Sequence, residues 1–446
     1  MKSIALFKSF VKTSLPAAVD LSSQSFMWIV EAILVGKLSA AALAGHGMAI
    51  QVVVVFFAVL LTFVVGAGLI INNHLGANRR QEANHIFGQA MIMGIILAVL
   101  FCLIWHFGAV HIFKLIKEGS SSSAQAAGES YLKILSYFPF IMINFVATGI
   151  IRATGDTRHS MTVNLFINGL NICLSPCLIF GWFAFPKLGV PGAALAAGIS
   201  HTLGFVLTFY YLRNARVSVQ LSFRELMRPR LESFKYLFLK GFPTTMEQAG
   251  WAFGQLVVMG YVGSIGVIHL STHTIFMRLQ NILSMFYMGF SLAAMSHMGK
   301  HLGAKDRELA EHTAHVAHRA MILFVVVIVA LMLLSSRFII KVFTTNPETV
   351  AMGSGVIFIF ALAQIPKALN NVISGNLRGA DDLHWLMFSV MAFVLVFEIG
   401  FNYIAAFVFG WGLWGVWSVQ TADESIRVGL NYIRFLKGKW RKGASE

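Results

Sequence analysis

The sequence predicts an all-α polytopic membrane protein, with twelve transmembrane helices in two six-helix lobes related by a pseudo-twofold axis. The first observation is composition: 57% of the 446 residues are hydrophobic and 12% are charged, whereas a soluble domain has about a quarter charged residues. The second is that apolar runs of about 20 residues, each able to cross a bilayer as a helix, recur along the chain. The third is a polar segment that occurs twice in the sequence.

The apolar runs divide the chain into twelve expected spans. They cover residues 14–36, 48–72, 88–116, 130–151, 160–182, 191–213, 242–262, 271–297, 318–343, 351–375, 386–408 and 412–436. The residues before the first span include Lys2, Lys8 and Lys12, and they show no small-residue cleavage pattern after a short apolar core. We therefore expect a cytoplasmic lead-in rather than a cleaved signal peptide.

Basic residues follow the even-numbered spans and are scarce after the odd-numbered ones. The longest even-numbered loop, 214–241, holds six of them: Arg216, Arg224, Arg228, Arg230, Lys235 and Lys240. Because Lys and Arg collect in cytoplasmic loops, both termini and this central loop are expected to be cytoplasmic. The same distribution accounts for the net charge of +15, so the excess of basic residues does not indicate a nucleic-acid partner.

The polar segment HLGANRRQEANH (74–85) returns as HLGAKDRELAEH (301–312), with seven of twelve positions identical and a separation of 227 residues. Other pairs have the same separation: Pro16 and Pro243, Phe26 and Phe253, Gly36 and Gly263, His46 and His273, Pro139 and Pro366. The two polar segments follow the second and eighth spans. We expect them to end one helix and begin the next, and to do no chemistry.

An internal duplication of this kind is typical of transporters. Each repeat has six spans, an even number, so both start on the same side of the membrane and the repeats are parallel. The expected domains are an N-terminal lobe (1–213), a cytoplasmic linker (214–241) and a C-terminal lobe with a basic tail (242–446). The expected site lies between two lobes that rock against each other. The alternative is a duplication that serves folding alone.

The chain resembles the multidrug and toxic compound extrusion (MATE) family, within the superfamily that also holds lipid-linked oligosaccharide and polysaccharide flippases. The matching segments are Pro16, VEAILVGKL (30–38), HLGANRRQEA, RATGDTRHSM (152–161), LIFGWFAFPKLGVPGAALA (178–196), STHTIFMRLQN (271–281), HLGAKDRELA and GNLRGADD (375–382). The resemblance implies a secondary exporter of lipophilic, often cationic, small organic molecules. It would work as a monomer in the plasma membrane of a bacterium, with a proton or sodium ion as its coupling ion and no other cofactor.

A charged side chain inside a membrane helix costs a few kcal/mol, about 2.5–3.5 on insertion scales, so it is a candidate functional residue. Glu31 lies within the first span, with Gln24 and Asp20 two and three turns earlier on the same face and Pro16 below them. The resemblance implies that an acid at Glu31 takes part in ion coupling. Low polarity favours the protonated carboxyl, so Glu31 could carry a proton inward. For Asp20 we expect a hydrated exit-path or gate residue; a structural carboxylate is the alternative for both acids.

The fifth span carries Asn171 and Ser175. In the sodium-binding members that the chain resembles, an Asp occupies the place of Ser175, and a Thr occupies the place of Ala197. Sodium prefers several hard oxygen ligands with charge among them, by the logic that governs other hard cations. One carboxylate, one amide and one hydroxyl make a poorer site, so the prediction favours proton coupling through Glu31 over sodium.

The second half holds two further charged candidates. Glu247 takes the repeat position of Asp20 and is expected at the wall of the C-terminal cavity. Lys367 takes a place that is acidic in another branch of the family, and the corresponding place in the seventh span holds Trp251. Lys367 is expected to repel a cationic substrate, to pair with Glu247 or to favour an anionic substrate, or else to extend toward the membrane surface. Glu398 and Arg278 are weaker candidates.

Aromatic residues complete the predicted substrate cavity. Trp28, Trp251, Phe286 and Tyr287 lie on spans that line the lobe interface in the family, and their faces suit stacking and cation–π contacts. For any one of them, ordinary packing is the alternative.

Other function classes find no support in the sequence. The chain contains no phosphate-binding glycine loop with lysine, no HExxH and no CxxC, and its three cysteines lie in apolar runs without metal spacing. We therefore expect neither an enzyme nor a metal site. The alternative within the superfamily is a flippase or exporter of a lipid-linked or amphipathic metabolite. A membrane receptor or embedded enzyme is the rival from another class.

Overall fold

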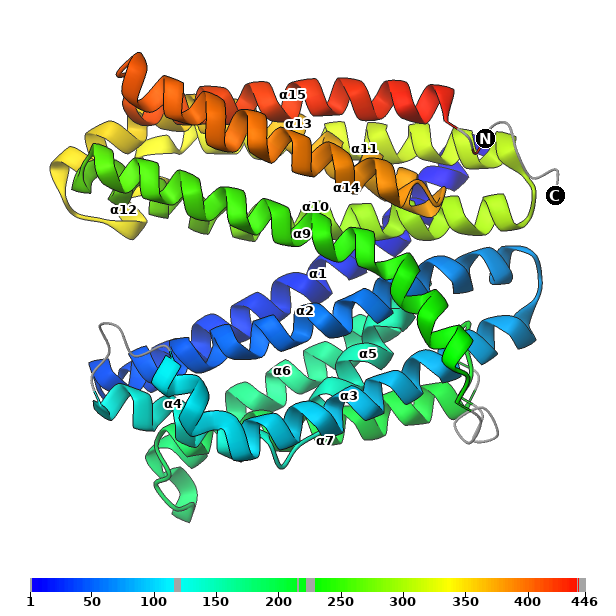
Figure 1. Ribbon diagram of the computed structural model, residues 1–446, viewed down its shortest axis with the longest axis horizontal. Helices are drawn as coiled ribbons and strands as arrows, with labels where there is room; N and C mark the ends of the chain where they lie inside the picture. Colours follow the sequence, from blue (N-terminus) through cyan, green and yellow to red (C-terminus); the bar gives the residue numbers. More distant parts are fainter. Residues whose placement is uncertain (1, 116–121, 215, 222–228, 439, 441–446) are drawn as a thin grey trace. The chain divides into compact units, whose positions relative to one another are not determined.

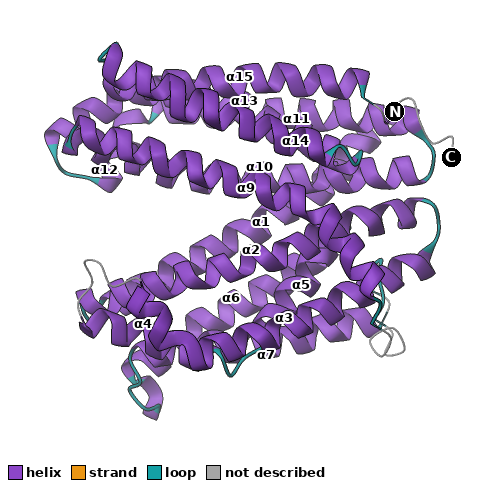
Figure 2. Ribbon diagram, viewed as in Figure 1, coloured by secondary structure: helices purple, strands orange, loops and turns teal. Residues whose placement is uncertain are grey.

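A computed structural model describes residues 2–115, 122–214, 216–221, 229–438 and 440 of the chain. Within these residues the regular secondary structure is helical throughout, as Figure 2 shows. Long helices are the expected solution for a chain in lipid, because a helix satisfies its own backbone N–H and C=O groups where no water is present.

The first half of the chain contains the helices of six spans, which Figure 1 labels in order. They are α1 (Lys2–Gly36), α2 (Ala40–Gly76), α3 (Arg80–Leu115), α4 (Ser122–Leu135) with α5 (Phe140–Ala153), α6 (Thr157–Phe180) and α7 (Val190–Arg213). A single 3₁₀ turn, η1 (Trp182–Ala184), follows α6.

The second half contains the other six. They are α9 (Leu231–Ile265), α10 (Val267–Gly303), α11 (Arg307–Leu334) with α12 (Ser336–Phe343), α13 (Pro347–Gly379), α14 (Leu383–Phe393) with the π-helical segments η2 (Val394–Phe401) and η3 (Ile404–Val408), and α15 (Gly412–Lys437). In the part of the chain that the structure describes, each of the twelve predicted spans therefore falls mostly on helix, with short breaks in some of them. Several helices start earlier than predicted; α9, for example, begins inside the predicted linker.

Eight of the described helices are long and apolar enough to cross a membrane by composition, and α4 with α5 forms a ninth, broken span. The three predicted spans outside this set are α9, α10 and α15. Each carries charged residues within its apolar run, such as Glu247 in α9, Arg278 in α10 and Glu424 in α15. Length does not separate these helices from the others; a lower mean hydropathy, to which polar residues and glycines contribute, does.

The fourth span is not the single helix predicted over 130–151. α4 and α5 meet at a bend of 70° between Leu135 and Phe140, and Pro139 is the residue that precedes α5. Proline has no backbone N–H and its ring crowds the preceding turn, so it interrupts a helix readily. The matching Pro366 lies inside α13, which continues past it. The two repeats therefore use the same proline differently.

The chain forms two compact units: residues Val19–Phe242, and residues Met1–Ala18 together with Pro243–Glu446. The divisions fall close to Pro16 and at Pro243, so α1 and α9 each contribute to both units. The predicted lobes 1–213 and 242–446 and the linker 214–241 have their boundaries at the ends of predicted spans. The observed divisions instead fall inside α1 and α9. That lobe division stays a prediction.

In the unit Val19–Phe242, glycines allow helices to approach closely. A Cβ on Gly45 of α2 would lie 2.8 Å from both the amide nitrogen of Gly128 and the Cβ of Ala127 in α4. A Cβ on Gly241 of α9 would lie 2.6 Å from the carbonyl carbon of Thr62 in α2. Small residues drive helix association in membranes because backbones can then come into contact.

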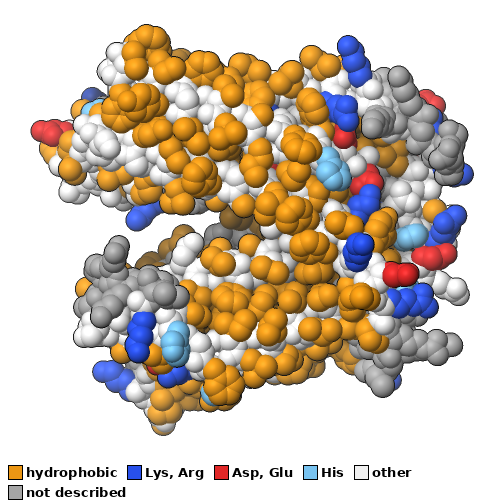
Figure 3. All heavy atoms as spheres, viewed as in Figure 1, with side chains coloured by type: hydrophobic (Ala, Val, Ile, Leu, Met, Phe, Trp, Pro, Cys, Tyr) orange, Lys and Arg blue, Asp and Glu red, His pale blue; other side chains and the backbone are white. Residues whose placement is uncertain are grey.

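In the other unit, α10 and α13 pack in the same manner. A Cβ on Gly375 would lie 2.8 Å from Ser291 Oγ, and one on Gly379 would lie 2.6 Å from the carbonyl oxygen of Met295. Phe276 and Phe360 stack with ring centroids 4.7 Å apart. This tight contact fixes the polar face of α13 within the unit. The exposed faces of the helices are largely hydrophobic, as Figure 3 shows and as lipid contact requires.

The close approach of α2 and α4 predicts a matched pair of variants. Gly45→Ala forces the α4 backbone to move, and we expect it to destabilise the purified protein by about 1–3 kcal/mol. Gly47→Ala, two residues later, meets nothing within 4 Å and should be neutral or stabilising by about 0.5–1 kcal/mol. Heat unfolding in detergent measures both; equal melting temperatures for the two variants would contradict the packing.

Candidate functional site

Glu31 is a buried carboxylate in the unit Val19–Phe242. Its side chain, one turn and a half before the end of α1, is 2% exposed. The hydroxyl of Tyr131 in α4 donates to Glu31 Oε1 over 3.0 Å, and His46 Nε2 of α2 lies 3.3 Å from the same oxygen. The imidazole and phenol rings meet edge to face, with centroids 5.0 Å apart. Three helices therefore converge on one carboxylate.

The local packing explains this convergence. Gly45 immediately precedes His46, and Gly128 lies three residues before Tyr131, so the close α2–α4 contact brings both rings to Glu31. Sequence reasoning identified Glu31 but not these two partners. The signal available for His46 was its match with His273 across the repeat.

Glu31 differs from most of the buried acids in having no guanidinium or ammonium partner. Three of the others are tied to arginine: Asp20 to Arg152 at 2.9 Å, Glu247 to Arg378 at 2.6 Å and Asp423 to Arg427 at 2.6 Å. Glu424 lies 3.5 Å from Arg427. Within the described part of the chain, Glu31 and Glu398 are the buried carboxylates held by groups without a fixed positive charge. A permanent cation favours the ionised form of an acid, and Glu31 has none.

Asp20 lies in a fully bonded cluster. Besides the Arg152 ion pair, Ser160 donates to it over 2.6 Å and Asn164 over 2.7 Å. These partners come from α5 and α6, whereas those of Glu31 come from α2 and α4. The predicted shared face of α1 thus serves two separate groups of partners, and Gln24 lies half-buried between them.

α6 presents a polar face of Ser160, Asn164, Asn168, Asn171 and Ser175, spaced three or four residues apart. Asn168 donates to Ser23 of α1 over 2.9 Å. The predicted pair Asn171 and Ser175 is joined within α6, because the serine hydroxyl donates to Asn171 Oδ1 over 2.9 Å. The repeated asparagines were the sequence signal for Asn164 and Asn168, which sequence reasoning missed.

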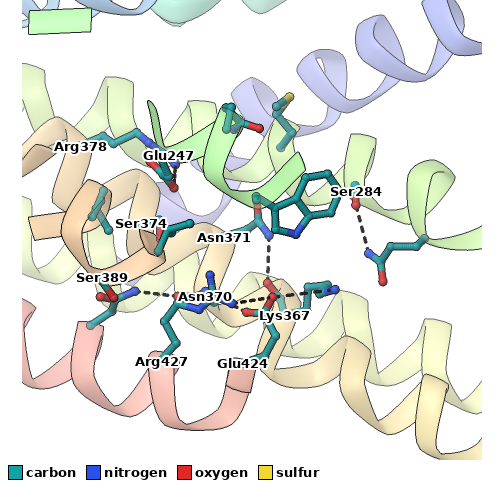
Figure 4. Close-up of a pocket in the computed structure, with 17 residues that line it drawn as sticks. Glu247, Ser284, Lys367, Asn370, Asn371, Ser374, Arg378, Ser389, Glu424 and Arg427 are labelled. Atoms are coloured by element: carbon teal, nitrogen blue, oxygen red, sulfur yellow. Dashed lines mark hydrogen bonds and ion pairs between the residues drawn. The ribbon is translucent and has the colours of Figure 1, made fainter. Parts of the chain in front are cut away.

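The unit that contains Pro243–Glu446 has a cavity of about 160 Å³. Its polar and charged lining comes from four long helices and α14, and Figure 4 labels ten of these residues. The lining residues are Glu247, Gln248, Trp251, Gln280, Ser284, Met288, Lys367, Asn370, Asn371, Ser374, Arg378, Leu386, Ser389, Val390, Glu424, Arg427 and Asn431. The predicted Glu247, Trp251 and Lys367 are therefore brought together around one cavity.

The charges form two groups in the wall, which Figure 4 shows apart, with Asn371 and Ser374 between them. Arg378 binds Glu247 in one group. In the other, Lys367 Nζ lies 3.8 Å from Glu424. The prediction that Lys367 could pair with Glu247 is wrong, because Arg378, eleven residues or about 16 Å further along α13, takes that carboxylate.

α15 contributes three charges that sequence reasoning missed. Asp423, Glu424 and Arg427 are all buried, and Asn370 of α13 donates to Glu424 Oε2 over 2.9 Å. The signal was present, since the segment DESIR places three charges in five residues inside the predicted span 412–436. A nearby acid, Glu398 of η2, accepts from Gln420 over 2.7 Å.

The predicted aromatic residues lie in different places. Trp251 lines the cavity. Phe286 packs against Phe324 with ring centroids 5.7 Å apart. Tyr287 is fully buried and donates to Gln364 over 3.3 Å. Trp28 is half-buried and belongs to the unit Val19–Phe242.

Comparison with known proteins gives a consistent result. The MatE family model matches residues 16–177 and again 243–404, which reproduces the 227-residue repeat. The chain is 28% identical over 444 residues to the probable multidrug resistance protein NorM of Thermotoga maritima, covering 98% of this chain and 94% of the relative. It is 23% identical over 390 residues to the multidrug resistance protein MdtK of Yersinia pseudotuberculosis, covering 87% and 85%.

A solved outward-facing structure of a multidrug resistance MATE family transporter superposes with a TM-score of 0.89, at 21% identity and 99% coverage of both chains. The predicted fold class, an all-α membrane protein of twelve spans in two six-helix lobes, is confirmed. With a family model that matches both halves of the chain and relatives that cover nearly all of it, the protein belongs to the multidrug and toxic compound extrusion family of membrane transporters.

Proposed function

We propose that this protein exports lipophilic organic compounds, cationic ones among them, from the cytoplasm in exchange for protons. Membership of a transporter family supports the general activity, and relatives such as NorM and MdtK are described as multidrug resistance proteins. In this proposal the protein works as a monomer in the plasma membrane with cytoplasmic termini, by alternating access of the substrate site to the two sides.

The observation that carries proton coupling is the environment of Glu31. Its partners, Tyr131 and His46, are a phenol and an imidazole rather than an arginine or a lysine. An ionised Glu31 accepts hydrogen bonds from the Tyr131 hydroxyl and from an Nε2–H of His46. A protonated Glu31 can instead donate to Nε2 when His46 is the other tautomer. The same three residues therefore accommodate both protonation states.

Sodium fits the same surroundings less well. Sodium prefers several oxygen ligands, by the logic that applies to other hard cations. Ser175 of α6 stands where sodium-binding relatives are expected to have a second acid, and its hydroxyl already occupies Asn171 Oδ1. A proton needs only the one carboxylate that Glu31 supplies.

Pro16 is the point at which α1 would bend when Glu31 is protonated. Proline cannot donate a backbone hydrogen bond to the residue four positions earlier, here Lys12, so the helix bends more readily there. Since α1 contributes to both compact units, with the division after Ala18, a change in its course alters how its two parts pack. We propose that protonation of Glu31 removes a buried charge and favours a bent α1, which expels the substrate.

Replacing the carboxyl tests this mechanism. In proteoliposomes with a pH gradient, Glu31→Gln should reduce export of a cationic dye to the level of protein-free vesicles, because an amide cannot carry the proton. Dye fluorescence in the vesicle lumen measures the rate.

The matched control is Glu129→Gln. Glu129 lies on α4 two residues before Tyr131, but it is partly exposed and paired with Lys133. Its substitution should leave export unchanged. Wild-type export by Glu31→Gln would exclude Glu31 as the proton carrier.

Imposing the two ion gradients separately tests the coupling ion. Because only one carboxylate is available at the Glu31 site, a proton gradient alone should drive export by the wild type. A sodium gradient of equal size at constant pH should not. Export driven by sodium alone would replace the proton in this proposal while leaving the exporter function in place.

A further inference from the structure

Three residues that line the cavity of the unit containing Pro243–Glu446 have buried polar atoms without a hydrogen-bond partner. Arg427 Nε, Arg378 Nε and Ser389 Oγ are buried and have no hydrogen-bond partner in the protein, and all three residues line the cavity. Arg427 is 5% exposed and Ser389 is 8% exposed. Leaving a buried donor unpaired is unfavourable, so each of these groups favours a ligand that brings an acceptor within its reach.

Lys367 is a fourth donor that is only loosely engaged. It is 6% exposed, and its Nζ lies 3.8 Å from Glu424, beyond hydrogen-bond distance. An ammonium group has three N–H donors. The loose pairing therefore leaves Lys367 with capacity for another acceptor.

Four acceptor groups in the same wall accept hydrogen bonds from other side chains of the protein. Glu424 Oε2 accepts from Asn370, and Asn370 Oδ1 accepts from Asn431. The carboxamide oxygen of Asn431 accepts from Trp385, and that of Gln280 accepts from Gln364. The buried unsatisfied side-chain atoms of the lining residues are two arginine Nε–H donors and one serine hydroxyl, which can donate or accept.

The charges around the cavity show which cation is available to a ligand. Three cationic residues line it, Lys367, Arg378 and Arg427, against two carboxylates, Glu247 and Glu424. Asp423 binds Arg427 at 2.6 Å but does not line the cavity. With Asp423 included, three cations face three carboxylates, and the arginines are the closely paired cations. An anionic group would therefore be met by Lys367, whose nearest carboxylate is 3.8 Å away.

Size limits the ligand to one part of a molecule. About 160 Å³ is close to the roughly 150 Å³ of a protein cavity that holds benzene, whereas whole drug-sized ligands occupy about 300–1,000 Å³. Trp251 and Met288 line the same cavity and offer an apolar surface for a ring. The cavity suits a single ring that carries a polar substituent.

We propose that this cavity is a subsite for an oxyanion group of an amphipathic substrate, a carboxylate or sulfonate attached to an aromatic ring. Lys367, Arg427 and Ser389 donate to the oxyanion, and Trp251 packs against the ring. The inference rests on the proposed export function and narrows its substrates: zwitterions and organic acids are bound better here than pure cations of the same shape.

Two dyes that differ in one group test the proposal. Rhodamine 110 has a free carboxylate, and rhodamine 123 is its methyl ester. The full-length protein in lipid nanodiscs, titrated without any ion gradient and followed by fluorescence anisotropy against empty nanodiscs, should bind rhodamine 110 more tightly. Loss of a hydrogen bond to a charged group is worth about tenfold or more in affinity. Lys367→Met should therefore weaken rhodamine 110 binding by about tenfold and change rhodamine 123 binding little.

One control variant and one further test variant accompany Lys367→Met. Lys341→Met removes an exposed lysine of α12 and should leave both affinities unchanged. Ser389→Ala removes a single hydroxyl and should also act selectively on rhodamine 110; it decides the question if Lys367→Met does not fold. Tighter binding of rhodamine 123 by the wild type, or equal losses for both dyes in Lys367→Met and Ser389→Ala, would overturn the proposal.

The binding measurement is independent of ion coupling, because no gradient is present and Glu31 lies in the other compact unit. Preference for rhodamine 110 with failed proton-driven export would leave the subsite standing and remove the coupling proposal. Proton-driven export without a preference for rhodamine 110 would leave the coupling proposal standing and remove the subsite.

Discussion

Every charge that this chain places inside its membrane helices must find its partner within the protein, because lipid offers no water to solvate it. This constraint explains the ion pairs Arg152–Asp20, Arg378–Glu247 and Arg427–Asp423. It explains as well why α15, with three buried charges, packs along the polar face of α13. The exceptions are then informative: Glu31 has partners without fixed charge, and the donors around Lys367 lack acceptors.

Residues at matching positions of the two repeats make different contacts. The position that holds Glu31 in the first half holds the buried Val258 in the second. His46 binds Glu31, whereas the matching His273 has an unpaired Nδ1 and lies against Trp417. Pro139 coincides with a 70° bend, while Pro366 lies in a continuous helix beside Lys367. The first half has Glu31, a buried acid without a fixed positive partner. The second half has a cavity lined by residues of both charges.

Much of the fold and part of the site could be predicted because their signals are local. Apolar runs located all twelve spans, and the constant separation of matched residues revealed the two repeats. Glu31, Glu247 and Lys367 stood out as charges in apolar surroundings. The DESIR segment of α15 was equally visible in the sequence, but it was not singled out. The bend before Phe140 was not predictable, since Pro366 shows that the same residue can be accommodated.

By itself, the sequence determined the class of protein, the number of spans, the duplication and the resemblance to a transporter family, because hydrophobicity and spacing are properties of the chain alone. Only the tertiary structure decided which charges are neutralised. The pairing of Glu247 with Arg378 rather than Lys367, the convergence of Tyr131 and His46 on Glu31, and the unpaired donors of Arg427 and Ser389 depend on contacts between helices far apart in sequence. For Glu31, the close approach of α2 and α4 at Gly45 and Gly128 brings the partners together, which no single helix reveals.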